Sequence, residues 1–455
     1  MQYNNLLAWR EYQKKLKAAD NTKKRTKKIL KYSVILFFLF VPFYCLFTNM
    51  SCHHGMLQKN STSVNNKGNE HSDVKGYLNK KKIQTVLGNK SLLNLTDNSF
   101  SCYWKRQHLR VNTSINVSLQ QYILKKIKLD TTKSIGIVVM NPSTGEIISM
   151  VGYDKTGMSK NPCIDSRFPA ASVFKIVTAA AAIETCGLNS KSLLKYNGGK
   201  YTLYKSQLKN KTNKYTHSIS LRESFAKSIN PVFGKIGIYY LGKNTLSRYA
   251  SAFGFNRNIN FEIQLSPSSI SLSDKPFHLA EIASGYNRKT MISPMHGALM
   301  IAAIFNHGML IEPSIVKNII DDNGDIIYSS HLTPINHAIT DKSSQEMIRL
   351  LRATITSGTC RKTFRGYKKD RVLSKLDIGG KTGTINNNIK AIQYDWFVGF
   401  AEDKGGGKQL VISIVVEHEK YIGIKASQYA RFTIKKYFDN YFVQMKKKYD
   451  NNKKI

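Results

Sequence analysis

Three short motifs carry the residue types that acyl transfer through a serine requires. They are Ser172-Val-Phe-Lys175, Ser228-Ile-Asn230 and Lys381-Thr-Gly383, in this order along the chain. Each motif alone occurs by chance in a sequence rich in Lys, Ser and Asn, whereas the ordered set is typical of serine acyltransferases. The combination therefore predicts an enzyme that forms a covalent intermediate on a serine.

The first motif predicts a nucleophile and its base. A serine hydroxyl is a weak nucleophile until a neighbouring base takes its proton. Lys175 follows Ser172 by three residues, so on a helix the two side chains lie on one face. Apolar neighbours on both sides of Lys175 would desolvate its ammonium group and lower its pKa. We therefore expect Ser172 as nucleophile and Lys175 as base; a lysine at the edge of a core helix is the alternative interpretation.

The second motif predicts one wall of a substrate groove. Ser228 and Asn230 are separated by one residue on an expected connection between two helices, so both side chains can project to the same side. The Ser228 hydroxyl can then relay protons as a third catalytic group, and the Asn230 amide can bind a substrate amide.

The third motif predicts the opposite wall of the groove. Glycines at 379, 380 and 383 mark the start of an apolar strand whose backbone a peptide can approach closely. Its cation and hydroxyl groups suit a terminal carboxylate. The substrate-binding residues expected here are Lys381, Thr382, Gly383 and Thr384. The backbone N–H groups of Ser172 and Thr384 are expected to form an oxyanion hole. A phosphate-binding loop is excluded because G-x-x-x-x-G-K-[ST] is not satisfied.

Apolar runs, caps and turn residues predict the elements that position these motifs. Residues 135–140 and 146–151 predict a hairpin, and residues 171–186, closed by Gly187, predict a buried helix. A polar, hairpin-like stretch follows at 195–217. Further helices are expected at about 220–227, 231–241, 294–305, 340–356 and 424–448, and further strands at 378–384, 394–401 and 409–417. The pattern predicts an α/β fold with an antiparallel five-stranded sheet flanked by helices and an inserted all-helical lobe.

A membrane anchor is predicted near the amino terminus. A basic leader precedes an apolar run at residues 33–47, which favours one uncleaved span with the amino terminus inside. The run is shorter than an ideal span of about 20 residues, so a cleaved signal peptide is the alternative. The expected division is a leader at 1–32, an anchor at 33–48, a juxtamembrane linker or small module at 49–111, a catalytic domain at 112–445 and a basic tail at 446–455.

Charge and cysteine usage exclude several classes of partner. Lys and Arg number 69 against 29 Asp and Glu, a formal net charge of +40. No basic stretch interleaves with aromatic residues, so a nucleic-acid partner is not expected. The six cysteines show no spacing typical of a metal site, and we expect no metal or other cofactor. Disulfide pairing stays open for the cysteines outside the membrane run, which are Cys52, Cys102, Cys163, Cys186 and Cys360.

Beyond the three motifs, the sequence resembles the transpeptidase domain of penicillin-binding proteins, in particular the monofunctional, class B-like kind. The resemblance extends from about residue 112 to residue 441. It includes Val138-Val-Met-Asn-Pro-Ser-Thr-Gly-Glu-Ile147, Gly358-Thr-Cys-Arg361 and Asp395-Trp-Phe-Val-Gly-Phe400. The implied fold is the one shared by serine β-lactamases and these transpeptidases.

The resemblance implies a peptidoglycan D,D-transpeptidase. Ser172 would attack the penultimate D-alanine of a stem peptide, and an amine of a neighbouring stem would then accept the acyl group. β-Lactam antibiotics would trap Ser172 as an acyl-enzyme. Such an enzyme would be a single-pass protein of the cytoplasmic membrane with its catalytic domain outside. A glycosyltransferase is a candidate partner because the segment before residue 112 is too short to hold one.

Three other functions share parts of this pattern. A D,D-carboxypeptidase would use water as the acceptor, and the sequence does not identify the acceptor. A β-lactamase would need a carboxylate that promotes deacylation, but the candidate Glu262 lacks the E-x-x-L-N context. A β-lactam sensor would resemble polytopic proteins, whereas one span is visible in this sequence.

Overall fold

The structure, a computed structural model, describes residues 78–387, 392–419 and 421–452. Contacts within the chain separate residues 1–72 from residues 73–455, and the fold described below belongs to the second unit. The predicted leader and anchor lie outside the described residues. Within the described ranges, no helix combines the length and the apolar character needed to cross a membrane.

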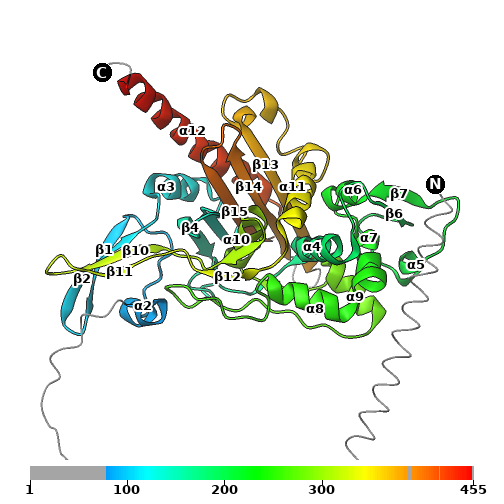
Figure 1. The fold of residues 1–455 in the computed structure, drawn as a ribbon, viewed down its shortest axis with the longest axis horizontal. Helices are drawn as coiled ribbons and strands as arrows, with labels where there is room; N and C mark the ends of the chain where they lie inside the picture. Colours follow the sequence, from blue (N-terminus) through cyan, green and yellow to red (C-terminus); the bar gives the residue numbers. More distant parts are fainter. Residues whose placement is uncertain (1–77, 388–391, 420, 453–455) are drawn as a thin grey trace, which may run out of the picture. The chain divides into compact units, whose positions relative to one another are not determined.

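A five-stranded antiparallel sheet forms the centre of this unit, in the order β13-β14-β15-β3-β4. Its early strands are β3 (Thr132–Met140) and β4 (Ile147–Asp154), and its late strands are β13 (Leu376–Asn387), β14 (Ile392–Asp403) and β15 (Gln409–Glu419). Because β15 pairs with β3, segments from both ends of the domain meet in one sheet (Figure 1). The predicted five-stranded sheet is confirmed, and β13 lies at its edge.

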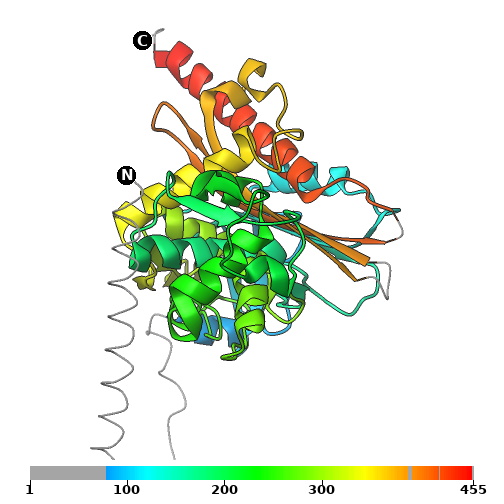
Figure 2. The same ribbon diagram turned by 90° about the vertical axis from the view of Figure 1, so that its right-hand side faces the viewer.

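The two faces of the sheet carry separate apolar layers because side chains alternate along each strand. On β3, Val138 packs into one layer and Ile137 into the other. The first layer contains α4 (Lys175–Cys186) and α10 (Pro294–Phe305), and the second contains α3 (Val117–Lys126) and α12 (Ala426–Asn452). Figures 1 and 2 show α12 on the opposite side of the sheet from the green helices of the lobe.

The segment between α4 and α10 forms a lobe of mainly short helices. These are α5 (Lys205–Leu208), α6 (Leu221–Ala226), α7 (Asn230–Lys235), the π-helix η2 (Ile236–Leu241), α8 (Gly242–Ala252) and α9 (Pro276–Ser284). The prediction of an all-helical lobe is wrong, because β6 (Leu193–Tyr196) and β7 (His217–Ser220) pair as a hairpin, at the hairpin-like stretch predicted for residues 195–217. The hairpin forms because alternate residues of β6 are buried. Next to the lobe, α11 (Asp341–Thr356) contacts both α6 and β13.

A second, four-stranded antiparallel sheet combines strands from before β3 with strands from between α10 and α11. It contains β1 (Ser99–Trp104), β2 (Gln107–Thr113), β10 (Val316–Asp321) and β11 (Ile326–Ser329), with α2 (Lys80–Leu87) preceding it. Residue 112, the predicted start of the catalytic domain, lies within β2, and β2 pairs with β10. Other elements are the pairs β5 (Phe168–Pro169) with β8 (Met291–Ile292) and β9 (Met309–Ile311) with β12 (Pro334–His337), and the 3-10 turns η1 (Ala171–Phe174), η3 (Tyr367–Lys369) and η4 (Leu373–Lys375).

Four cysteines lie in the described residues, and all four are free thiols: Cys102, Cys163, Cys186 and Cys360. Burial raises the pKa of Cys163 and of Cys360 to about 12. These two thiols are therefore protonated at neutral pH and pack as small apolar groups.

Candidate active site

Ser172 lies in η1 (Ala171–Phe174), a 3-10 turn that leads directly into α4. The preceding Ala171 has a φ of 48°, in the left-handed region that residues with a side chain seldom adopt. Its carbonyl packs against Gly285, where a Cβ atom would lie 1.9 Å from the Ala171 oxygen. The turn before Ser172 is thus held in a strained form by the loop after α9, a feature that clusters at functional sites.

Lys175 is fully buried at the start of α4 and makes three hydrogen bonds. Its Nζ lies 2.8 Å from Ser172 Oγ, 2.8 Å from Asn230 Oδ1 and 2.5 Å from the Ser284 carbonyl oxygen. Burial holds the pKa of Lys175 well below its usual value of 10.5, and the positive charge of Lys381 makes a second, smaller contribution in the same direction. The low pKa favours the neutral amine, which can accept a proton from Ser172 at this distance.

Ser228 and Asn230 lie where α6 ends and α7 begins, as the sequence predicts. Ser228 has a φ of 56°, which interrupts the helical path between the two helices. Asn230 Oδ1 accepts from Lys175, and Asn230 Nδ2 donates to the Tyr201 carbonyl at 2.9 Å. Because both ends of the Asn230 amide are engaged, its orientation is fixed.

Lys381 brings the third motif to the same place. Its side chain is fully buried, and its Nζ donates to Ser228 Oγ at 2.9 Å and to the Thr382 carbonyl at 2.8 Å. Burial lowers the pKa of Lys381 to about 7. Lys175 therefore joins Ser172 to Asn230, and Lys381 joins β13 to Ser228. The structure brings together the side chains of all three predicted motifs.

Glycines allow β13 to pass close to the turn that carries Ser172. A Cβ atom at Gly383 would lie 3.2 Å from Val173 Cγ2. At Gly379 and Gly380, a Cβ atom would lie 2.4 and 2.5 Å from aromatic ring atoms of β14. Packing against η1 and β14 therefore requires these glycines. The N–H groups of Ser172 and Thr384, which are predicted to form an oxyanion hole, belong to η1 and β13, the two segments that pack together here. The oxyanion hole itself stays a prediction.

Thr359 contacts the third motif, although the sequence analysis did not predict it as a site residue. Its Oγ1 lies 2.6 Å from Thr382 Oγ1, and its backbone N–H donates to the Ala226 carbonyl. The adjacent Gly358 permits this contact, since a Cβ atom there would lie 2.3 Å from the Ala226 oxygen. The hydroxyl next to a glycine in Gly358-Thr-Cys-Arg361 was the signal available in the sequence.

Glu262, the carboxylate considered for a β-lactamase, is fully engaged elsewhere. It is buried and accepts hydrogen bonds from the Ser314 hydroxyl at 2.5 Å, the Tyr328 hydroxyl at 3.1 Å and the Ile315 backbone N–H at 3.2 Å. Burial raises the pKa of Glu262 despite these donors. Its partners belong to the four-stranded sheet and the segment before it, so Glu262 has a structural role there.

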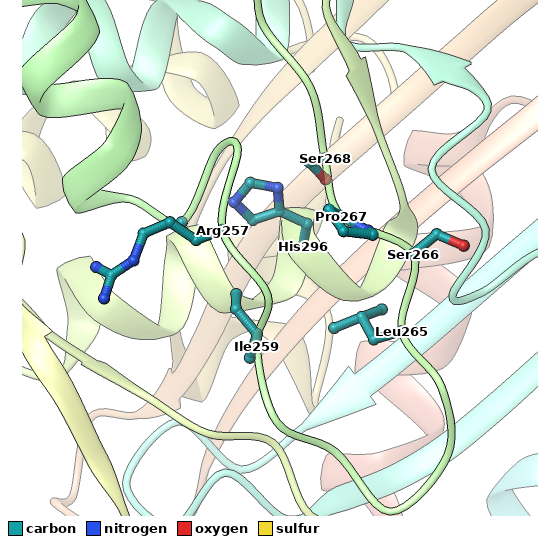
Figure 3. Close-up of a pocket in the computed structure, with 8 residues that line it drawn as sticks. Arg257, Ile259, Leu265, Ser266, Pro267, Ser268 and His296 are labelled. Atoms are coloured by element: carbon teal, nitrogen blue, oxygen red, sulfur yellow. The ribbon is translucent and has the colours of Figure 1, made fainter.

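A small pocket lies outside the catalytic cluster. Figure 3 shows it between the loop of residues 254–268 and His296 of α10. His296 is buried, its Nε2 is 2.7 Å from the Phe253 carbonyl oxygen, and its Nδ1 has no partner among the described atoms. The cavity measures about 10 Å³, room for about one water molecule. It contains none of the three motifs and is too small for a peptide substrate.

Comparisons with known proteins identify the same domain. The family described as "Penicillin binding protein transpeptidase domain" matches residues 135–435. Stage V sporulation protein D of Bacillus subtilis is 26% identical over 309 residues, which make up 62% of this chain and 45% of that protein. This chain thus spans about half the length of that curated relative.

Solved structures share the fold. The D,D-transpeptidase domain of a peptidoglycan glycosyltransferase from Eggerthella lenta has a TM-score of 0.58 at 24% identity, with 71% of this chain and 82% of that chain covered. Penicillin-binding protein A from M. tuberculosis, solved as an imipenem acyl-enzyme complex, has a TM-score of 0.57 at 21% identity, with 71% of this chain and 78% of that chain covered.

Proposed function

Because the chain belongs to the penicillin-binding protein transpeptidase family, we propose that it is a peptidoglycan D,D-transpeptidase that cross-links stem peptides through an acyl-enzyme on Ser172. The observation that carries the proposal is the contact of Lys175 Nζ with both Ser172 Oγ and Asn230 Oδ1, next to the contact of Lys381 with Ser228. This arrangement supplies a nucleophile, a base with a lowered pKa and a proton relay in one groove.

In the first half of the proposed reaction, Lys175 takes the proton of Ser172 as Oγ bonds to the carbonyl carbon of the penultimate D-alanine. The N–H groups of Ser172 and Thr384 stabilise the resulting oxyanion. The C–N bond then breaks, the leaving terminal D-alanine takes a proton through Ser228, and an ester on Ser172 remains. Lys381 and Thr382, with Thr384 beside them, bind the carboxylate of the leaving residue, and Asn230 binds the substrate amide.

In the second half, the amine of a neighbouring stem peptide attacks the ester. A new amide bond forms, the Ser172 Oγ–carbon bond breaks, and the proton of the amine returns to Ser172 through the same groups. A D,D-carboxypeptidase, in which water attacks the ester, is the alternative. β-Lactams would acylate Ser172 in place of the stem peptide, and the imipenem acyl-enzyme of penicillin-binding protein A supports this by analogy.

We also propose the setting of the enzyme. The basic leader and the apolar run at residues 33–47 support a single span in the cytoplasmic membrane, with the catalytic domain outside. A separate glycosyltransferase would supply the glycan strands. A β-lactamase function is less well supported, since Glu262 lies in a structural cluster away from the motifs.

The experiment is incubation of the protein with a stem pentapeptide, with and without an amine acceptor, followed by mass measurement of the products. We expect loss of one D-alanine and a cross-linked product that requires the acceptor. Release of D-alanine with only the hydrolysed tetrapeptide in both reactions would indicate the carboxypeptidase. Ser172→Ala is the control and should release no D-alanine.

A further inference from the structure

Arg288 lies on the loop between α9 and β8 and reaches the edge strand of the central sheet. Its Nε donates to the Asn386 carbonyl at 3.0 Å, and its Nη2 donates to the same oxygen. The Arg288 side chain is exposed. Within the described part of the chain, no carboxylate forms an ion pair with it. A guanidinium group has five N–H donors, so three remain available for a ligand.

The contacts of Arg288 and Lys381 define which backbone groups of β13 remain open. Lys381 Nζ occupies the Thr382 carbonyl, and Arg288 occupies the Asn386 carbonyl. Alternate residues of a strand present their backbone groups to the same edge. Thr384, midway between them, therefore presents its N–H and carbonyl to this edge. An incoming peptide meets the Thr384 carbonyl as an open acceptor between two cations.

We propose that Arg288 selects acyl donors that carry an acidic side chain on the third residue from the carboxyl end. The inference rests on the proposed function, in which the donor's terminal carboxylate lies at Lys381 and Thr382 and its penultimate residue lies opposite Thr384. Because two paired extended strands advance one residue for one residue, the preceding residue then lies opposite Ile385, next to the Asn386 carbonyl that holds Arg288. A carboxylate at this point forms a charge-assisted hydrogen bond with the guanidinium.

A purely structural role for Arg288 predicts a different result. If Arg288 only ties its loop to β13, its removal slows the reaction of every donor by the same factor. If Arg288 recognises the negative charge of the donor, its removal changes the ratio of the reaction rates of an acidic donor and its neutral isostere. The ratio therefore separates the two roles.

The test compares three N-acetylated tripeptides that end in D-Ala-D-Ala and begin with glutamate, glutamine or lysine. The readout is kcat/KM for D-alanine release by the full chain and its variants. For the natural protein we expect a preference of about threefold to fivefold for glutamate over glutamine, and the lowest value for lysine. Arg288→Gln should abolish the preference, and Arg288→Lys should keep part of it. The matched control Lys289→Gln removes an adjacent exposed charge and should leave the preference intact.

Equal values for glutamate and glutamine in the natural protein, or a preference that survives in Arg288→Gln, would overturn the inference while D-alanine release upholds the proposed function. If no tripeptide reacts, the same ratio is measured as acylation rates of two penicillins that differ only by a carboxylate on the acyl side chain. Failure of every peptide and every penicillin to react would overturn the proposed function and this inference with it.

Discussion

Lys175 and Asn230 share a hydrogen bond of 2.8 Å between Nζ and Oδ1, and both side chains are buried. The Tyr201 carbonyl fixes the other end of the Asn230 amide, so its oxygen is kept toward Lys175. A neutral acceptor at this position leaves the pKa of Lys175 low, because it adds no negative charge that would favour the ammonium form.

Asn230→Asp should therefore impair catalysis by changing the base. A carboxylate beside Nζ raises the pKa of Lys175 and keeps it protonated near neutral pH. We expect the second-order rate of acylation by penicillin at pH 7 to fall about 10-fold to 100-fold, with the rate profile displaced to higher pH. Asn230→Ala, which removes the contact without adding charge, should slow acylation without the displacement. An unchanged pH profile in Asn230→Asp would refute the assignment of Lys175 as base.

Lys381 should make carboxylate recognition dependent on pH. Its pKa of about 7 means that the ammonium form prevails below pH 7 and is lost as the pH rises above it. We expect the acylation rate of a penicillin, divided by the rate of its carboxyl methyl ester, to decrease between pH 7 and pH 9. Because both acylation rates depend on Lys175 in the same way, dividing one rate by the other cancels the effect of Lys175 titration. A ratio that stays constant over this range would show that the Lys381 charge does not bind the carboxylate.

Lys381→Met should stabilise the fold at the expense of activity. The folded state lowers the pKa of Lys381 from 10.5 to about 7, so the unfolded state binds more protons between these two values. The loss of stability caused by burying Lys381 is therefore complete below about pH 7 and decreases as the pH rises toward 10.5. We expect Lys381→Met to raise the free energy of unfolding by about 2 kcal/mol at pH 6, with a smaller gain at pH 9.

Denaturant unfolding at the two pH values measures this difference. Lys408→Met is the control, because Lys408 is exposed and its replacement should alter stability little at either pH. A loss of stability in Lys381→Met at pH 6 would show that the hydrogen bonds of Lys381 outweigh the cost of its burial.

Thr359 should contribute to carboxylate binding through Thr382. When the Thr359 hydroxyl donates to Thr382 Oγ1, the proton of Thr382 is free to donate to the substrate. Thr359→Val keeps the shape but removes the donor, and we expect KM for the pentapeptide to rise about threefold to tenfold with kcat nearly unchanged. Thr359→Ser should restore KM. A decrease in kcat alone would place Thr359 in a different step.

The sequence predicts the parts of the site that local patterns encode. The helix α4, which follows the turn that carries Ser172 and itself carries Lys175, ends at Gly187 in the left-handed conformation, as its C′ position requires. Ser220 caps α6 through the Glu223 backbone, as the capping box indicates. The three late strands appear where apolar runs and turn residues place them.

The remaining parts depend on contacts between distant segments. The Ser284 carbonyl that binds Lys175 lies 109 residues away from it in the sequence, and no local pattern indicates this pairing. The same holds for Gly285, which is needed only because the Ala171 carbonyl packs against it. The strands β1 and β2 were missed because their sequences are half-exposed, and β2 gains stability from pairing with β10, far along the chain.

The most direct test of the account is the mass of the protein after reaction with penicillin, followed by identification of the modified peptide. We expect one stable adduct with the mass of the intact penicillin, located on Ser172, and no adduct in Ser172→Ala. An adduct on another residue, or no adduct on a folded protein, would contradict the assignment of Ser172 as the nucleophile that Lys175 activates.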